Sequence, residues 1–248
     1  MESIGSRDRF PQLFAGLALL SASAIASSFL WAGAIGNMKR VDDALVITGS
    51  AKRPIKSDYI VWRVTLTSQQ PTTQAAYQQL TGWIDRVQAY LKAANVPASE
   101  ISLGSLSTVS VPEVTDGRET GKTLSYRLTQ QLEIRSNQVD RYAKLSQEIN
   151  SLINEGIGIT SEPPEYLYNK LSELRIEMVA EATKDAKARA ESIAQSTGNR
   201  VGRVRSADTG VFQITPRYST AVSGEGRYDT SSIDKDITAV VSVKFGID

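Results

Sequence analysis

Residues 10–38 form one uncharged and mostly apolar stretch, with Arg9 before it and Lys39 and Arg40 after it. As a helix this stretch would be about 43 Å long, whereas about 20 apolar residues are enough to cross the hydrocarbon core of a bilayer. The pattern therefore predicts a transmembrane anchor over residues 10–38.

A cleaved secretory signal is the alternative interpretation of this stretch. Arg7 and Arg9 would be its basic start, Leu13–Leu20 its apolar centre and Ala24-Ile25-Ala26 its small-residue cleavage site. However, the apolar run continues beyond that site to Trp31, where an aromatic ring suits the membrane interface. This continuation favours an anchor that is retained.

The length of the segments on either side of the anchor predicts its orientation. A tail of residues 1–9 precedes it and a large domain of residues 42–248 follows it. Leaving the short tail in the cytoplasm is the simpler arrangement. We therefore expect residues 1–9 to be cytoplasmic and residues 42–248 to form an extracytoplasmic domain.

Beyond the anchor, strand and helix periods alternate along the chain. In Asp58–Thr67, Ile60, Trp62, Val64 and Leu66 recur at every second position, which is typical of a strand with one buried face. Further strands are predicted over residues 44–51, 101–111, 124–135, 157–161, 200–206 and 237–247, and helices over residues 71–95, 137–154 and 169–197.

Three of these elements have a predicted apolar face. The faces are Leu124, Tyr126, Leu128, Leu132 and Ile134 in the strand over 124–135, Ile237, Ala239, Val241, Val243 and Phe245 in the last strand, and Leu171, Leu174, Met178, Ala182, Ala186, Ala190 and Ile193 in the last helix.

Two polar segments interrupt these elements. Pro112–Lys122 is predicted to be a turn-rich loop between two paired strands, and Pro216–Asp236 a mobile loop with few apolar anchors. Strands and crossover helices thus mix in one sheet system. The sequence predicts an α+β fold in which helices pack on one face of an antiparallel or mixed sheet.

Composition excludes several classes of chemistry. The chain contains no His and no Cys, so it has no Ser-His-Asp or Cys-His catalytic group, no disulfide and no His- or Cys-ligated metal. Its net charge is +1 and both signs are interspersed. The nearest approach to a basic patch is Arg200, Arg203 and Arg205, typical of a solvated strand edge, so nucleic-acid binding is not predicted.

A few short motifs carry weak signals of chemistry. The Gly117–Thr123 segment resembles a phosphate-binding loop, but its glycines are one residue too close and a strand follows where the motif requires a helix. Asp229, Asp234 and Asp236 have no EF-hand spacing. Ser50 and Lys52 share a strand face and could form a Ser–Lys dyad, but Ser and Lys are often neighbours by chance.

Aromatic residues on the apolar faces are predicted to be core residues. These are Trp62, Trp83 and Tyr126. No residue is therefore assigned a catalytic, cofactor-binding or metal-binding role, and the protein is not expected to be an enzyme.

A longer pattern resembles a known family. Leu174-Arg175 is followed by Asp185-Ala186-Lys187, Arg189-Ala190 and Ile193-Ala194, and Gly198, Gly202 and Val204 complete a helix-to-strand signature. This pattern resembles the SIMPL-domain family of bacterial envelope proteins.

Other segments agree with that family in order, although Ala51 stands where many members have a second Gly and Ser57-Asp58 replaces a common Pro-Asp. Val46-Ile47-Thr48-Gly49 opens the similar region, and Ile237–Phe245 closes it. The resemblance covers about residues 42–248.

The resemblance implies an α+β domain, often secreted or anchored, homo-oligomers that are sometimes ring-like, and a loose link to oxidative stress. It transfers no catalytic residue.

Together these observations predict a single-pass protein of the bacterial inner membrane whose periplasmic domain self-assembles as a scaffold or stress-related interaction module. One alternative is an accessory subunit that binds another membrane or envelope protein. A second is an enzyme that uses carboxylates or Ser and Lys on envelope glycans, which would require two carboxylates about 5–9 Å apart in a cleft.

Overall fold

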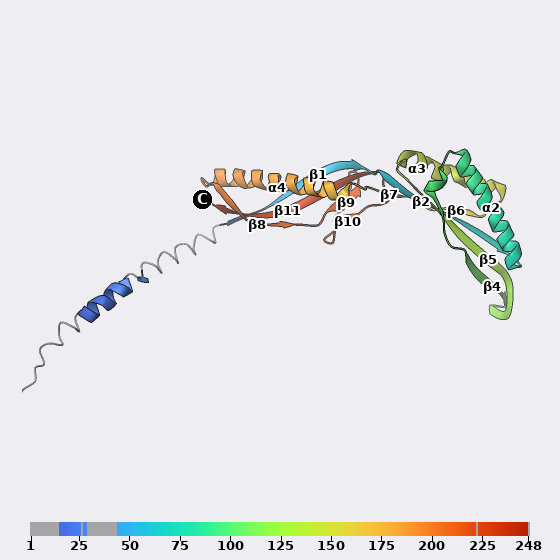
Figure 1. The fold of residues 1–248 in the computed structure, drawn as a ribbon, viewed down its shortest axis with the longest axis horizontal. Helices are drawn as coiled ribbons and strands as arrows, with labels where there is room; N and C mark the ends of the chain where they lie inside the picture. Colours follow the sequence, from blue (N-terminus) through green and yellow to red (C-terminus); the bar gives the residue numbers. More distant parts are fainter. Residues whose placement is uncertain (1–14, 26, 29–43, 222, 248) are drawn as a thin grey trace, which may run out of the picture. The chain divides into compact units, whose positions relative to one another are not determined.

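The computed structural model describes residues 15–25, 27–28, 44–221 and 223–247 (Figure 1). Residues 15–25 and 27–28 are helical. Among the described residues, no helix is both long enough and apolar enough to cross a membrane. Much of the predicted anchor over residues 10–38, and the whole predicted tail over residues 1–9, lies outside the described residues, so both stay predictions.

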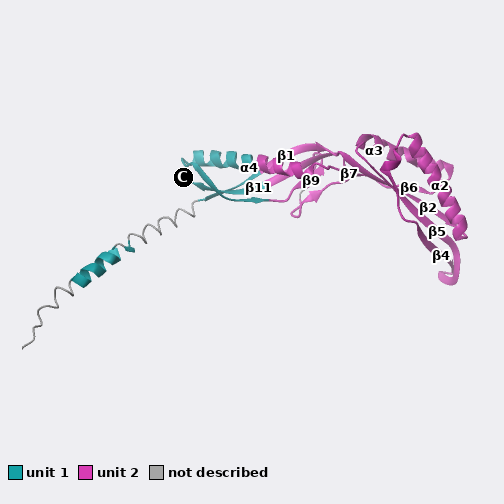
Figure 2. Ribbon diagram, in the orientation of Figure 1, with its two compact units in different colours: residues 1–49, 183–209, 241–248 teal, residues 50–182, 210–240 magenta. Residues whose placement is uncertain are grey.

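The chain divides into two compact units (Figure 2). Unit 1 comprises residues 1–49, 183–209 and 241–248, and unit 2 comprises residues 50–182 and 210–240. Three of the four boundaries between the units fall inside β1 (Ala44–Lys56), α4 (Leu171–Ser196) and β11 (Asp234–Ile247). The sites discussed below lie in unit 2.

The structure confirms an α+β fold but contains two sheets where the sequence predicted one sheet system. The first sheet has the order β1-β11-β9-β10, with β8 also paired to β11. Its remaining strands are β8 (Val201–Thr209), β9 (Gln213–Pro216) and β10 (Arg227–Tyr228). It is a mixed sheet, because β10 runs parallel to β9 whereas β11 is antiparallel to β8 and β9.

The second sheet is antiparallel in all its pairings and lies entirely in unit 2. Its order is β3-β5-β2-β6, with β4 paired to β5 and β7 paired to β2. Its strands are β2 (Tyr59–Gln70), β3 (Ile101–Leu103), β4 (Ser107–Thr115), β5 (Arg118–Ser136), β6 (Ile159–Ser161) and β7 (Glu165–Leu167).

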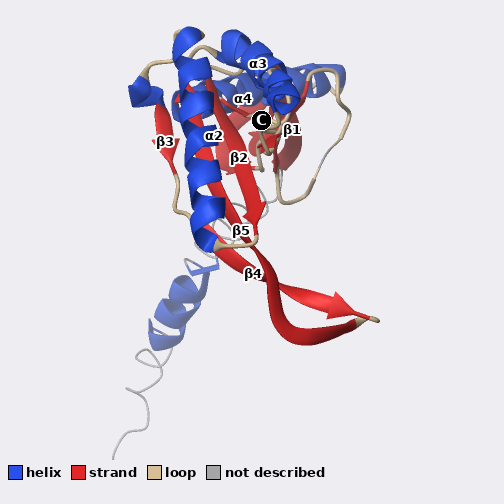
Figure 3. Cartoon of the chain, turned by 90° about the vertical axis from the view of Figure 1, so that its right-hand side faces the viewer, coloured by secondary structure: helices blue, strands red, loops and turns tan. Residues whose placement is uncertain are grey.

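Helices α2 (Thr73–Ala93) and α3 (Val139–Glu148) pack on the second sheet (Figure 3). The Thr72 side chain caps α2 by accepting a hydrogen bond from the Ala75 amide at 3.2 Å. Short 3₁₀ segments, Ala98–Glu100 and Ile149–Glu155, follow these helices. The second of them replaces the end of the helix predicted over residues 137–154, and it stops at Gly156, whose φ of 78° lies in the left-handed region.

The core of unit 2 lies between these helices and the sheet. Trp62 is fully buried, as its place in the alternating pattern predicted, whereas Trp83 and Tyr126 are only partly buried and pack against the core. The strand pattern is also confirmed for the other members of its buried face, Ile60, Val64 and Leu66.

Helix α4 presents a narrow apolar face with a strict four-residue spacing. Its buried residues are Leu174, Met178, Ala182, Ala186, Ala190 and Ala194. The predicted face included Ile193, which is instead exposed, and Ala194 takes the buried position. The alternating residues predicted for the last strand are all buried in β11.

Gly158 precedes β6 at a point where unit 2 has no room for a side chain. A Cβ there would collide with the Thr67 carbonyl and lie 2.9 Å from the Trp83 ring. The Gly158 carbonyl also accepts a hydrogen bond from the Thr67 amide at 2.9 Å, so the backbone cannot easily move away.

We expect Gly158→Ala to lower the free energy of unfolding by about 1–3 kcal/mol, because overpacking displaces the Trp83 ring or the β2 backbone. Gly82→Ala is the matched control, since Gly82 lies inside α2 with nothing within 4 Å of an added Cβ. It should stabilise by about 0.5–1 kcal/mol. Chemical denaturation measures both changes, and an unchanged Gly158→Ala variant would contradict the close packing.

Candidate functional site

The paired ends of β4 and β5 form a hairpin, residues 107–124, that extends beyond the helices covering the rest of the sheet (Figure 3). We call residues 107–124 the outer hairpin. None of these residues is buried. Three of its apolar side chains are more than half exposed, at 54% for Val109, 58% for Val114 and 57% for Leu124.

The turn of the outer hairpin explains why the loop predicted over Pro112–Lys122 is wrong. Asp116 and Gly117 both have positive φ, 50° and 76°, as a two-residue hairpin turn with the twist of antiparallel strands requires. The strands therefore continue up to this turn, with Thr115 directly opposite Arg118. The Asp116-Gly117 pair is a sequence signal of such a turn, and the prediction of a loop did not use it.

The outer hairpin has surface contacts but no core of its own. Thr120 donates a hydrogen bond to Glu113 across the strands at 2.8 Å. An isolated two-stranded hairpin is only marginally stable in water. Its exposed apolar side chains therefore form a candidate surface for a partner.

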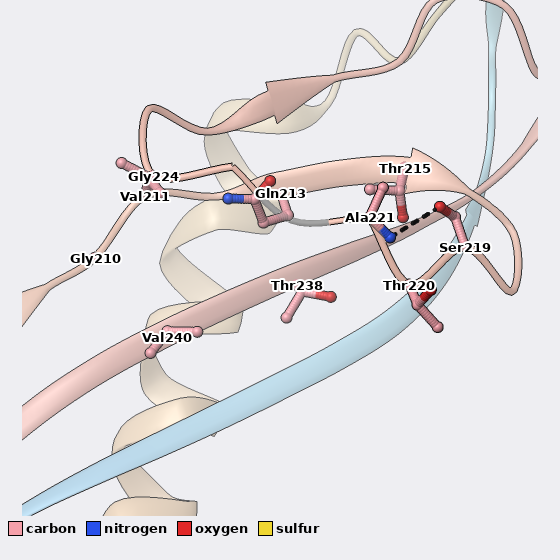
Figure 4. Close-up of a pocket in the computed structure, with 10 residues that line it drawn as sticks. All are labelled: Gly210, Val211, Gln213, Thr215, Ser219, Thr220, Ala221, Gly224, Thr238 and Val240. Atoms are coloured by element: carbon pink, nitrogen blue, oxygen red, sulfur yellow. Dashed lines mark hydrogen bonds between the residues drawn. The ribbon is translucent and has the colours of Figure 1, made fainter.

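A second feature of unit 2 is a cavity of about 510 Å³ on the first sheet (Figure 4). Its lining residues are Gly210, Val211, Gln213, Thr215, Ser219, Thr220, Ala221, Gly224, Thr238 and Val240. We call this cavity the hydroxyl pocket. None of its lining residues is charged.

Strand register places the polar lining residues of the hydroxyl pocket in one row. Gln213 on β9 lies opposite Thr238 on β11, and Thr215 lies opposite Asp236. Directly opposed residues of antiparallel strands share a face of the sheet. Ile237, between Asp236 and Thr238, is fully buried and points to the opposite face of the sheet. Figure 4 shows a helix behind these strands.

Gln213 is the least expected residue of the hydroxyl pocket. Its side chain is only 7% exposed, and its amide nitrogen donates a hydrogen bond to the Ser223 carbonyl at 2.6 Å. Among the described residues, its carbonyl oxygen Oε1 has no hydrogen-bond partner, and it is closed off from the open space of the pocket. Buried polar atoms in folded proteins nearly always have a partner, so Gln213 is an exception to that rule.

An ion pair holds one edge of the loop that flanks the hydroxyl pocket. The Asp236 carboxylate accepts from the Tyr218 amide at 3.1 Å and lies 3.0 Å from the Lys52 ammonium. Burial alone would raise the pKa of Asp236, but the hydrogen bonds from Lys52 and Tyr218 outweigh it and hold the pKa below its usual value. Asp236 therefore stays ionised and committed to these two partners.

A buried lysine holds the rest of the segment predicted to be a mobile loop, residues 216–236. Lys235 is 1% exposed, and its ammonium donates to the Tyr166 carbonyl at 2.6 Å and to the Asp229 carbonyl. It also lies 5.7 Å from the centre of the Tyr228 ring. The segment therefore has more anchors than its polar composition indicated.

Burial and a nearby charge shift the pKa of Lys235 in opposite directions. Burial lowers the pKa of Lys235, and the nearby Asp229 carboxylate partly offsets the effect. Burial would raise the pKa of Asp229, but hydrogen bonds from Ser231 and Ser232 and the charge of Lys235 lower it overall. Asp229 is thus used to close a turn in its own loop.

The weak motifs found in the sequence are dispersed by the fold. The Gly117–Thr123 segment is the turn and second strand of the outer hairpin, with no helix after it. Asp229 accepts a hydrogen bond from the Ser231 amide and so closes a turn. Asp236 forms an ion pair with Lys52, so the Lys52 ammonium is bound to a carboxylate instead of serving a Ser–Lys dyad. Within residues 44–221 and 223–247 and the described helical residues before them, no group of three or more acidic side chains could hold a metal.

Sequence reasoning missed the three residues on which these sites depend. Leu124 lies on the apolar face predicted for its strand, yet it is exposed because no helix reaches it. Gln213 and Lys235 carried no signal, because a lone polar residue in a polar segment gives no indication of burial.

The fold defines an α+β protein with two sheets, an exposed hairpin and an uncharged pocket. The SIMPL family model, described as a protein of unknown function (DUF541), matches residues 45–245. The chain therefore belongs to the SIMPL family, which confirms the resemblance in its sequence. A comparison with curated proteins found no match. The family description carries no activity, so function is argued below from the sites.

We expect Lys235→Met to lower the free energy of unfolding at neutral pH by about 1–3 kcal/mol, because it leaves the Tyr166 and Asp229 carbonyls buried without a donor. The pKa of Lys235 is lowered on folding, so the unfolded chain binds more protons just below pH 10.5. In that window the contribution of Lys235 makes stability rise with pH, and the variant should lose this contribution.

Denaturation curves measured at several pH values between 7 and 10.5 test this prediction. Lys92→Met, at an exposed position near the end of α2, is the control and should leave the curves almost unchanged. A Lys235→Met variant as stable as the unaltered chain at every pH would show that the buried ammonium is not an anchor.

Proposed function

We propose that this protein is a non-enzymatic, membrane-anchored envelope protein that assembles into a homo-oligomer through the outer hairpin and acts as a scaffold or interaction module. The single observation that supports it is the set of uncovered apolar side chains at Val109, Val114 and Leu124. Uncovered apolar side chains on a marginally stable element favour burial against another protein surface.

A second copy of the chain is the partner that the charges of the outer hairpin favour. Both signs are present on it, with Glu113 and Glu119 close in sequence to Arg118 and Lys122. A surface with both charges can oppose its own copy without a net repulsion. Most soluble oligomers are built from identical subunits, which adds to this preference.

Pro112 supports contact through side chains over pairing through strand edges. It lies in β4, whose pairing in the described part of the chain is with β5 alone. Proline has no backbone N–H to donate to a further strand, and it protects exposed edges from open-ended sheet growth. A closed assembly is the arrangement this favours.

The anchor and the location rest on the sequence alone. Residues 10–38 carry the length and the uncharged character of a membrane span. On this proposal the inner membrane brings the subunits together in two dimensions, with the SIMPL domain on its outer side.

The absolute mass of the full chain in a mild detergent, measured by light scattering, tests the proposal. The unaltered protein should be a multiple of the 27.0 kDa chain. The triple variant Val109→Ser, Val114→Ser, Leu124→Ser should shift toward the monomer. Its free energy of unfolding should change by only about 0.5 kcal/mol for each exposed site.

The matched control replaces three exposed apolar residues elsewhere in unit 2, as Tyr77→Ser, Ile153→Ser and Ile176→Ser. It should keep the mass of the unaltered protein. A monomeric unaltered chain, or equal masses for the two triple variants, would contradict assembly through the outer hairpin. Recovery of one stoichiometric foreign protein with a monomeric chain would favour the accessory-subunit alternative.

A further inference from the structure

The hydroxyl pocket is a hollow of unit 2 whose exposed lining is mostly apolar (Figure 4). Val211, Val240 and Ala221 contribute methyl groups, and Gly210 and Gly224 leave space beside them. Its volume of about 510 Å³ is well above the roughly 150 Å³ that is enough to hold a benzene molecule. The pocket can therefore receive more than one aliphatic side chain.

Several polar groups of the lining are already engaged within the fold. The Gln213 amide nitrogen donates to the Ser223 carbonyl at 2.6 Å, and the Gln213 Oε1 atom is closed off from the open space of the pocket. The Ser219 oxygen accepts from the Ala221 amide at 3.2 Å. None of the lining residues that the structure describes carries a charge. Removing polar groups from water without partners is unfavourable, so the pocket favours an apolar occupant.

The outer hairpin carries apolar side chains that suit this hollow. Val109, Val114 and Leu124 are more than half exposed, and the hairpin extends beyond the helices of its sheet, so it can enter a concave surface (Figure 3). Val114 is the closest of the three to the turn at Asp116. Because these side chains stay exposed within one chain, the pocket that receives them must belong to another copy.

The charges beside the two surfaces can be matched. Asp116 and Arg118 are exposed at the turn of the outer hairpin. Arg217 and Glu225 are exposed within two positions of pocket-lining residues along the chain. Each surface thus has one acidic and one basic residue at the edge of its apolar part. Opposite charges can therefore face each other when the surfaces meet, which fixes their relative orientation.

We infer that the outer hairpin of one copy inserts Val114 into the hydroxyl pocket of the next copy. The inference rests on the proposed function, because it names the surface that the outer hairpin meets on assembly. A contact between two different surfaces is head-to-tail, and each added copy brings both a new hairpin and a new pocket until the assembly closes. A hairpin packed on a second hairpin would be a symmetric contact that is complete with two copies.

The variant Gly224→Trp tests the role of the pocket. Gly224 is exposed, and among the described residues nothing lies within 4 Å of an added Cβ. The indole ring should occupy the pocket and shift the mass of the full chain in mild detergent from a multiple of 27.0 kDa toward a single chain. Light scattering measures this shift. Gly82→Trp is the matched control at an open position of α2 and should keep the mass of the unaltered protein.

A mixture of two variants distinguishes a head-to-tail contact from a symmetric one. The triple variant Val109→Ser, Val114→Ser, Leu124→Ser keeps an intact pocket, and Gly224→Trp keeps an intact hairpin. Each alone should be monomeric. Their equimolar mixture should form dimers and nothing larger, because only one hairpin and one pocket are left to pair. A contact between two hairpins would let Gly224→Trp assemble on its own.

Engineered cysteines locate Val114 directly, since the chain has no Cys of its own. Val114→Cys is mixed with Thr220→Cys, whose position lines the pocket and is exposed. A disulfide requires Cβ atoms about 3.5–4.5 Å apart, so mild oxidation should link the two variants to each other but neither variant to itself. Because both positions are exposed, this measurement keeps the test valid if Gly224→Trp fails to fold.

Three results would overturn the inference. They are a folded Gly224→Trp variant with the mass of the unaltered protein, a mixture of the two assembly variants that stays monomeric, and oxidation that gives no mixed disulfide or links Val114→Cys to itself. If the triple hairpin variant is monomeric while Gly224→Trp assembles fully, the inference fails and the proposed function stands. If the triple hairpin variant also keeps the unaltered mass, the proposed function fails with it.

Discussion

The length of β5 relative to the helix that covers it is the constraint on which the functional features of unit 2 depend. The strand has 19 residues and would span about 65 Å, whereas the 21 residues of α2 span about 32 Å. One half of the strand therefore lies under helices and contributes Leu128, Leu132 and Ile134 to the core. The other half has no cover and can only form the outer hairpin.

This mismatch separates stability from interaction within one continuous element. The covered half pairs with β2 over eleven residue positions, from Tyr126 opposite Gln70 to Ser136 opposite Ile60. The uncovered half is held to β4 by strand pairing and by surface contacts such as Thr120 with Glu113. Loss of the exposed apolar side chains should therefore have little effect on folding.

The polar segment after β9, residues 216–236, is held in place by buried polar groups instead of apolar side chains. Lys235 binds two backbone carbonyls and Asp236 binds Lys52 and the Tyr218 amide. A buried charge is tolerated only where such partners surround it. The contact between Asp236 and the Tyr218 amide holds the start of the loop that lines the hydroxyl pocket, whose lining residues are all uncharged.

The sequence by itself determined the features that depend on local periodicity and on the absence of residue types. The two-residue alternation predicted Trp62 and its neighbours as a buried strand face, the four-residue spacing predicted most of the buried face of α4, and the missing His and Cys excluded whole classes of chemistry. Only the tertiary structure decided that Leu124 is exposed, that Lys235 is buried and that Gln213 lines a pocket. The physical reason is that burial depends on which distant segments cover a residue, and period-two or period-four patterns carry no information about where a covering helix ends.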